Sequence, residues 1–477
     1  MRSLTLSLTL LMSTLASAGE PTLAETYRDA AGRLIGAALV SDHAYDRLGY
    51  LCDAHAPRLS GSAALEAAID WCADEMRADG FANVREEPVM VPRWVRGDEH
   101  ARLLQPVARR LNMLGLGDSV GTPPGGIEAE VVVVSSFDEL DALGEAGVKG
   151  KIVLYDVPFV TYGQTVQFRG SGPSRAAAYG AVAALVRSVG PGSYDTPHTG
   201  ALRYDEEQPQ IPAAAITIED SAMMRRMQER GDTIRMQLMM SAKMHEPVPS
   251  ANLVAEVVGH EKPDEIVVLA GHIDTWDVGQ GAQDDGAGCV IAWEAARLIQ
   301  ELDLKPRRTI RVVLYTNEEN GLAGGKTYVE EHADELTRHV AAIESDSGNG
   351  LASGFRFQVP PVSAEEEPDR RKAAREACDR PIAAEVKAIL DEVAPLLAPL
   401  DADVMRCAGS GADVGPIVEP GNTVALGLDH DTTEYFMIHH THADTFEKII
   451  KDDLNRNIAT MAVMAYVLAD MPGRLLP

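Results

Sequence analysis

Apolar runs of strand length alternate with polar loops and helical segments through the second half of the chain. Five such runs carry the pattern: residues 252–258, 265–270, 310–315, 340–343 and 423–428. After the second run, apolar side chains recur at helical spacing between Val290 and Ile299. Short apolar runs that alternate with helices are typical of a parallel sheet covered by helices. The pattern therefore predicts an open α/β sheet in this half.

Two further helices are predicted together with their ends. Ser62 is suited to cap a helix that extends to about residue 79, and Gly80 is a fitting stop. Near the C-terminus, residues 454–470 show apolar positions at helical spacing, and Asp452 or Asp453 precedes them as a cap. Each helix would place its apolar stripe against the core.

The middle of the chain has a different pattern. Glycine and proline gather around residues 117–126, which indicates a domain boundary. Beyond it the sequence predicts short strands and one apolar helix: strands at 131–134, 152–155 and 213–216, and the helix at 176–189. This segment contains no cluster of His, Asp and Glu, so we do not expect an active site of its own there.

These shifts in composition predict two structural units. A main domain would consist of residues 19–118 and 245–477, and residues 119–244 would form a β-rich insertion within it. Two prolines, Pro247 and Pro249, mark the return to the main domain.

The first 18 residues have the pattern of a secretory signal peptide. Arg2 is followed by an apolar run and then by the small residues Ala16, Ser17 and Ala18. The apolar run is shorter than the roughly 20 residues that span a membrane. We therefore expect an exported protein, secreted or periplasmic, without stable membrane insertion.

Composition narrows the partners and the covalent cross-links. A formal net charge of −29 without a basic cluster argues against nucleic acid and anionic membranes as partners. Five cysteines are too few for a disulfide-stapled fold, although an exported protein can form a bridge at Cys52–Cys72 or at Cys378–Cys407. The charged stretch 364–379 is predicted to be a solvated surface helix or loop.

Candidate metal ligands follow the strands at their carboxyl ends, where an open α/β sheet places its site. His272 and Asp274 stand two apart and so point to one side of an extended backbone, which suits an imidazole ligand held by a carboxylate. The same loop and three later strand ends add more candidates: Asp284, Asp285, Glu318, Glu319, Asp346, Asp431, His439, His440 and His442. A set limited to His, Asp and Glu is typical of zinc.

The motifs together resemble those of the co-catalytic di-zinc exopeptidases, which include secreted bacterial leucyl aminopeptidases and glutamate carboxypeptidases. They are His272-x-Asp274, Asp284-Asp285, Glu318-Glu319, Asp346 and His440-Thr441-x-x-Asp444-Thr445. Flanking segments at residues 58–62, 87–92, 271–281 and 435–440 are most similar to the plasma glutamate carboxypeptidase subfamily. The resemblance covers nearly all of the mature chain. It implies an eight-stranded, mixed and mostly parallel central sheet flanked by helices, interrupted by an inserted protease-associated domain.

The resemblance also implies how a metal centre would be built. Asp284 would bridge two zinc ions, His272 and Asp346 would hold one of them, and Glu319 and His440 the other. The peptide bond after the bridging Asp284 would be cis. Two dications set against three carboxylates leave a positive centre that activates a bridging water and polarises a peptide carbonyl.

The remaining residues of the site are expected to move protons or to contact substrate. Glu318 is the expected general base, since neighbours on an extended chain point to opposite sides and Glu319 already serves as a ligand. Asp274 is expected to orient His272. Asp431, Tyr435 and His439 are candidate substrate contacts.

These expectations combine into an exported di-zinc exopeptidase that hydrolyses short peptides, with unblocked dipeptides as the expected substrates. Two alternatives stay open: an aminopeptidase that acts on longer peptides, and a non-catalytic, receptor-like relative on the same scaffold. All five ligand positions and Glu318 are filled, which favours an enzyme. The oligomeric state stays open, and a homodimer is compatible with the sequence.

Overall fold

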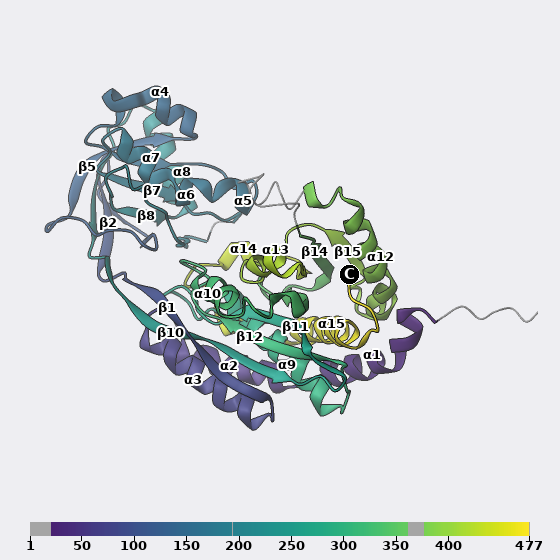
Figure 1. Ribbon diagram of the computed structural model, residues 1–477. Coiled ribbons are helices and arrows are strands. Elements are labelled where there is room, and N and C mark those ends of the chain that lie inside the picture. The colour runs from purple at the N-terminus through teal and green to yellow at the C-terminus, as the bar shows by residue number, and fades with distance from the viewer. Residues whose placement is uncertain (1–20, 193, 361–375, 477) are drawn as a thin grey trace, which may run out of the picture.

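The computed structural model describes residues 21–192, 194–360 and 376–476. Two eight-stranded sheets organise these residues into a larger and a smaller lobe (Figure 1). The predicted signal peptide and most of the charged stretch 364–379 lie outside the described residues.

The sheet of the larger lobe is mixed. In spatial order its strands are β1 (Ala82–Val95), β10 (Lys243–Val257), β12 (Arg308–Tyr315), β11 (Lys262–His272), β13 (His339–Glu344), β16 (Val424–His430), β14 (Ala352–Gln358) and β15 (Val404–Cys407). The four central strands β12, β11, β13 and β16 pair in parallel. Antiparallel pairs at β1–β10, β10–β12 and β14–β16 flank them, and β15 is parallel to β14. The predicted mixed, mostly parallel sheet is confirmed.

Helices cover both faces of this sheet. They are α1 (Leu23–Leu39), α2 (His43–His55), α3 (Ala63–Ala78), α9 (Ala287–Glu301), α10 (Ala323–Glu331), α12 (Pro381–Leu397), α13 (Val418–Gly421), α14 (Tyr435–Ile438) and α15 (Lys451–Asp470). Alternate side chains of β11 enter two different cores: Val267 and Leu269 join the core that includes α9 and α15, while Val268 joins the one that includes α10. Burying one such side chain contributes roughly 1.5–3 kcal/mol. Two-sided burial explains why the strands are continuously apolar.

The two predicted helix ends differ in outcome. The hydroxyl of Ser62 accepts a hydrogen bond from the backbone N–H of Leu65 at 3.2 Å, and Gly80 follows α3 with a φ of +84°, so both caps are confirmed. The last helix begins at Lys451, and no side chain caps it. Asp452 and Asp453 instead lie in its first turn, where their charge faces the positive end of the helix dipole.

The smaller lobe contains the second sheet. Its strands, in spatial order, are β3 (Arg109–Leu111), β2 (Glu99–Gln105), β9 (Arg235–Met240), β5 (Ile127–Val134), β6 (Ile152–Tyr155), β7 (Ala183–Arg187), β8 (Ala213–Ile216) and β4 (Met113–Gly115). The accompanying helices are α4 (Phe137–Val148), α5 (Tyr162–Thr165), α6 (Gln167–Gly170), α7 (Gly172–Ala178) and α8 (Ile218–Glu229). Figure 1 shows the lobe at the upper left, joined to the larger lobe through the long strands β1 and β10.

This lobe departs from the sequence prediction at one helix, and its sheet includes strands that precede residue 119. The helix predicted at 176–189 is wrong: α7 ends at Ala178, and β7 pairs in parallel with β6 and β8. Gly180, with a φ of +80°, breaks the segment, and a short apolar run does not distinguish helix from strand. The sheet also begins at Glu99, ahead of residue 119, because β2 pairs antiparallel with β9. The predicted domain limits stay a prediction.

Of the two proposed disulfides, the structure contains Cys378–Cys407. Cys52, Cys72 and Cys289 are free and buried. Within the described residues, no helix has both the length and the apolar character needed to cross a membrane.

Candidate metal centre

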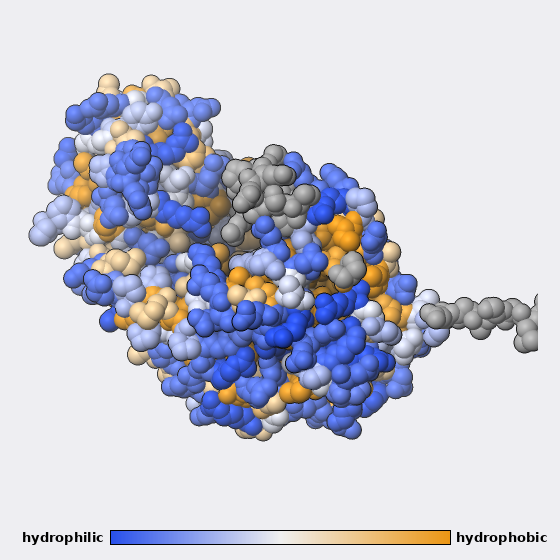
Figure 2. Space-filling model, viewed as in Figure 1, coloured by the Kyte–Doolittle hydropathy of each residue, from blue (hydrophilic) through white to orange (hydrophobic). Residues whose placement is uncertain are grey.

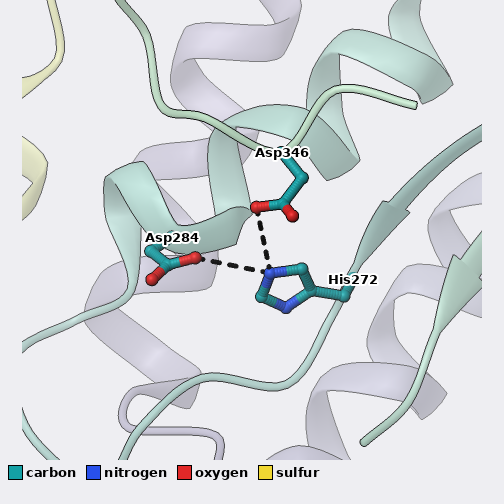
Figure 3. Close-up of side chains that lie close together, drawn as sticks. All are labelled: His272, Asp284 and Asp346. Carbon is teal, nitrogen blue, oxygen red and sulfur yellow. Dashed lines mark ion pairs between the residues drawn. The ribbon is translucent and has the colours of Figure 1, made fainter. Parts of the chain in front are cut away.

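Five side chains meet where the central strands of the larger lobe end. His272 closes β11, Asp284 lies on the loop that leads into α9, and Asp346 follows β13. The Nε2 atom of His272 is 3.4 Å from Oδ1 of Asp284 and 3.5 Å from Oδ1 of Asp346 (Figure 3). We call these three residues the first triad.

A second triad shares Asp284 with the first. The Nε2 atom of His440 is 3.1 Å from Oδ2 of Asp284 and 3.0 Å from Oε2 of Glu319. In each triad, one potential ligand atom per residue lies within 4.8 Å of the others. The structure therefore brings together all five residues that the sequence predicted as metal ligands.

The burial of this cluster fits bound cations. Side-chain exposure is 5% for Asp284 and 3% for Glu319, and burial raises the pKa of Glu319 to about 7. Within the described part of the chain, Oδ2 of Asp284 and Oε1 of Glu319 accept no hydrogen bond. Buried carboxylate oxygens without a partner are costly, and a cation between them removes that cost. Three carboxylates and two imidazoles are donors that suit zinc.

The loop that carries Asp284 is held by groups from two other parts of the chain. The carboxylate of Asp444 accepts hydrogen bonds from the backbone N–H groups of Ala282 at 3.2 Å, Gln283 at 2.7 Å and Asp284 at 3.1 Å. The peptide bond between Asp284 and Asp285 is cis, as predicted.

Arg58 holds the preceding part of the same loop. Its buried guanidinium donates to the carbonyl oxygens of Ile273 at 2.9 Å, Gln280 at 3.0 Å and Gly281 at 3.1 Å. Sequence reasoning gave no role to Arg58 or Asp444, although both lie within the motifs quoted above. A ligand loop that is fixed and buried needs hydrogen-bond partners for its backbone N–H and C=O groups. That need is the reason for a buried arginine and a buried aspartate in these motifs.

Glu318 and Asp274 lie beside the triads without belonging to either. Burial raises the pKa of Glu318 well above its usual range, and the negative charges of Asp346 and Glu319 add to this effect. The carboxylate of Asp274 accepts hydrogen bonds from the backbone N–H groups of Glu318 at 3.0 Å and Glu319 at 3.3 Å. It thus fixes the segment that bears the expected base.

The contact predicted between Asp274 and His272 has a different form in the structure. Nδ1 of His272 is 3.0 Å from the main-chain oxygen of Asp274 but 3.8 Å from its Oδ1. The backbone N–H groups of Glu318 and Glu319 donate to the carboxylate of Asp274. The main-chain carbonyl of Asp274 therefore orients the imidazole of His272 instead.

The smaller lobe reaches the second triad, which the sequence did not predict. The backbone N–H of Thr199 donates to the main-chain oxygen of His440 at 2.9 Å, and Nδ1 of His440 is 3.3 Å from the carbonyl oxygen of Thr199. His440 has a φ of +60°, a backbone state that costs a non-glycine residue about 1–3 kcal/mol and persists only where its surroundings fix it. Arg169 donates to the same Thr199 oxygen at 3.2 Å.

The three candidate substrate contacts separate into two groups. Tyr435 and His439 are buried, and neither ring nitrogen of His439 has a hydrogen-bond partner in the described chain. The rings of Tyr162 and His198, from the smaller lobe, lie 5.2 and 5.6 Å from that of His439. Asp431 is instead exposed, and its carboxylate accepts hydrogen bonds from the N–H and hydroxyl of Thr433. Asp431 is thus engaged in a surface turn.

A concavity also lies away from the two triads. It has a volume of 760 Å³ and lies on the smaller lobe, lined by Val120, Gly121, Thr122, Pro123, Ile127, Glu128, Ala129, Gly150, Ala181, Val182, Gln210, Ile211 and Pro212. Glu128 is the one ionisable residue among these. A small pocket adjoins the triads instead and is lined in part by Asp284, Glu319, His440 and Asp444.

Comparison with known proteins identifies the family. The profile of Peptidase family M28 matches residues 252–465. Carboxypeptidase Q of Mus musculus is 41% identical over 452 residues, which cover 94% of this chain and 91% of that protein. Carboxypeptidase Q of Homo sapiens is 42% identical over 434 residues, which cover 91% of this chain and 87% of that protein.

Solved structures agree with this result. The crystal structure of a peptidase M28 precursor from Shewanella amazonensis has a TM-score of 0.85 and 34% identity, covering 95% of this chain and 98% of the other. A zinc aminopeptidase from Bacillus subtilis shares the fold, with a TM-score of 0.65 and 20% identity, covering 91% and 97% of the two chains. The predicted family is confirmed: the chain belongs to peptidase family M28.

Proposed function

We propose that this family member is an exported exopeptidase that uses two zinc ions to hydrolyse short peptides. The observation that carries the proposal is the pair of triads that share Asp284, with Glu318 beside them and in neither. Their unpartnered carboxylate oxygens support a metal at each triad. When bound, the two ions would supply Lewis acidity for a peptide carbonyl and an activated water.

The protein groups divide the remaining work. Glu318 takes a proton from the attacking water and passes it to the nitrogen of the leaving amine. Burial and the neighbouring negative charges raise its pKa, and a carboxyl group with a raised pKa holds a proton more readily before it returns it. Asp274 holds the backbone of Glu318, so the carboxylate stays in place while the proton moves. Tyr435 and His439 are the proposed substrate contacts, and Asp431 is not.

The position of the smaller lobe beside the site favours short substrates. Tyr162 and His198 from the smaller lobe pack against His439, so the second lobe covers one side of the site. Figure 2 shows the surface hollowed between the two lobes. A covered site selects short chains by excluding longer ones, which supports unblocked dipeptides over long peptides.

Replacing Glu318 tests the mechanism. Glu318→Gln should lower kcat at least about 10²-fold, because the amide cannot accept the proton. Zinc content should stay at two ions per chain, since Glu318 is not in either triad. Near-normal activity would remove Glu318 from the mechanism, and loss of zinc would make it a ligand.

A substrate panel separates the alternatives. We expect higher kcat/KM for unblocked dipeptides than for tetrapeptides, and little hydrolysis of N-acetylated or C-amidated dipeptides at fixed zinc and pH. Efficient cleavage of long peptides or aminoacyl amides would favour an aminopeptidase. Absence of hydrolysis in a zinc-loaded chain would favour a non-catalytic relative.

Export and assembly are part of the proposal as well. The signal pattern of residues 1–18 and the Cys378–Cys407 bridge support an oxidising compartment outside the cytoplasm. Expression with the native N-terminus should release a protein into the periplasm or medium that begins after residue 18. Light scattering on that protein would decide between a monomer and a homodimer.

A further inference from the structure

The two histidines of the triads are supported by different lobes. Nδ1 of His272 lies 3.0 Å from the main-chain oxygen of Asp274, two residues further along the same segment. Nδ1 of His440 lies 3.3 Å from the main-chain oxygen of Thr199, which belongs to the smaller lobe. Nη1 of Arg169 lies 3.4 Å from the same Nδ1 atom, so two groups of the smaller lobe contact this side of the imidazole. These contacts orient the ring so that Nε2 faces Asp284 and Glu319, where a cation would bind.

Arg169 fixes the Thr199 carbonyl in place. Its Nη1 donates to that oxygen at 3.2 Å, and its Nη2 donates to the hydroxyl of Tyr162 at 2.8 Å. The arginine is 6% exposed. Gly200 leaves it the necessary room, because a Cβ atom at that position would lie 2.1 Å from Nη1.

Further contacts fasten Thr199 between the lobes. Its hydroxyl donates to the carbonyl of Gly115 at 2.8 Å. Arg96 donates to the Thr199 hydroxyl at 3.3 Å and, through Nε, to the Asp277 carboxylate at 2.8 Å. Asp277 follows β11, so this chain of contacts ties the smaller lobe to the loop of the metal cluster.

We propose that the smaller lobe controls the metal affinity of the second triad, because Thr199 and Arg169 position His440 for binding. The first triad does not depend on this contact, since its histidine is held from within the larger lobe. Thr199 and Arg169 are thus positioning residues. The inference rests on the two-metal function proposed above.

Two substitutions disturb the contact by different routes in the full-length chain. Arg169→Gln removes the guanidinium, and Gly200→Ala pushes it away from Thr199 while keeping the arginine. Loss of a hydrogen-bonded partner behind a metal ligand typically weakens metal binding 10–100-fold. Zinc titration at buffered free zinc should show that shift for one ion and none for the other. Arg169→Lys, which retains a charged donor, should show a smaller shift.

Backgrounds with a single intact triad assign the affected ion. Arg169→Gln combined with His272→Ala, which spares the second triad, should weaken the remaining zinc. Combined with His440→Ala, which spares the first triad, it should leave the remaining zinc unchanged. Arg187→Ala is the matched control, because Arg187 also lies in the smaller lobe and pairs with Asp156 at 3.0 Å without touching His440. It should leave both zinc affinities unchanged.

Each outcome has a distinct meaning. Wild-type affinity for both ions in Arg169→Gln and Gly200→Ala would overturn this inference and leave the proposed function intact. An equal loss of both ions, shared by Arg187→Ala, would indicate general destabilisation and also overturn it. A wild-type chain that holds fewer than two zinc ions would overturn the proposed function and this inference with it.

Discussion

The two triads share one aspartate but differ in what holds them. The first triad draws its own members, His272 and Asp346, from the ends of the adjacent parallel strands β11 and β13. The second draws Glu319 and His440 from loops, and His440 adopts a positive φ that a segment of the other lobe stabilises. The first triad is therefore held from within the larger lobe, whereas the second also receives a contact from the smaller lobe.

This difference indicates which of the two metal sites can be altered by substitutions without disruption of the fold. A parallel sheet fixes its strand ends through hydrogen bonds along the whole ladder, so a ligand there moves little. A ligand on a loop needs a partner from elsewhere, and Thr199 serves as that partner here. Changes in the smaller lobe should accordingly tune one metal site more than the other.

Removal of each histidine should have the largest effect and tests the independence of the triads. We expect His272→Ala to lose zinc from the first triad and His440→Ala from the second, each by more than the roughly 10–100-fold that follows loss of a supporting partner. Activity should fall with zinc in both cases, measured as zinc per chain and kcat/KM.

His442→Ala is the control for this pair, because His442 is exposed and lies two residues beyond His440. It should retain two zinc ions and near-normal activity. If it lost metal while His440→Ala did not, the assignment of the second triad would be wrong.

Asp444 should matter equally to both triads, because it supports the loop of the shared ligand. Asp444→Ala leaves the three buried N–H groups of residues 282–284 without an acceptor. At roughly 1–3 kcal/mol for each unsatisfied group, the free energy of unfolding should fall by at least about 3 kcal/mol. Urea denaturation measures this loss, and zinc titration should show weaker binding at both triads.

The control for Asp444 is Asp431→Ala, an exposed carboxylate in a surface turn. Its effect on stability should stay within about 0.5 kcal/mol, as for most surface substitutions. Selective loss of one zinc in Asp444→Ala would contradict a common support and place Asp444 with a single triad.

The sheet and the candidate ligands at its strand ends could be predicted from the sequence for one physical reason, whereas their grouping into triads is what the family resemblance implies. Strands that are buried on both faces have mostly apolar sequences, and β12 and β13 are buried at every residue. Ligands at the ends of such strands are therefore visible from the chain alone. The prediction of a helix over 183–187 is wrong because a short apolar run has no period that distinguishes a strand from a helix.

The support of the second triad could not be predicted in this way. Thr199 and Arg169 lie in a segment without clustered ligand-type residues, far along the chain from His440. Thr199 acts through its main-chain carbonyl, so its side chain carries no signal of the role. The hydrogen bonds of Asp274 to Glu318 and Glu319 were missed for a similar reason, since backbone acceptors and donors leave no trace in residue type.

A partly buried charged network elsewhere in the larger lobe offers the smallest and last test. The ring of His332 lies between two carboxylates, with Nδ1 2.7 Å from Glu335 and Nε2 2.9 Å from Glu87. Arg311 pairs with Glu256 at 2.7 Å and with Glu335 at 2.5 Å. Arg85 pairs with Glu87 at 2.7 Å, so three positive charges, including a protonated His332, balance the three carboxylates. The network should therefore stabilise the fold without a metal.

Its contribution should depend on pH. Burial alone would lower the pKa of His332, but hydrogen bonds to Glu335 and Glu87 outweigh burial and raise that pKa. Because the folded-state pKa lies above the unfolded value of about 6.5, His332 contributes stability that is fully present below pH 6.5. This contribution is lost as the pH rises through the folded-state pKa. His332→Gln should therefore destabilise the chain by about 1.5–3 kcal/mol in mild acid and by less in alkali, with zinc content unchanged. Urea denaturation across pH, with the exposed His245→Gln as control, would measure it. If the loss of unfolding free energy did not depend on pH, or if zinc were lost, His332 would not act through its charge.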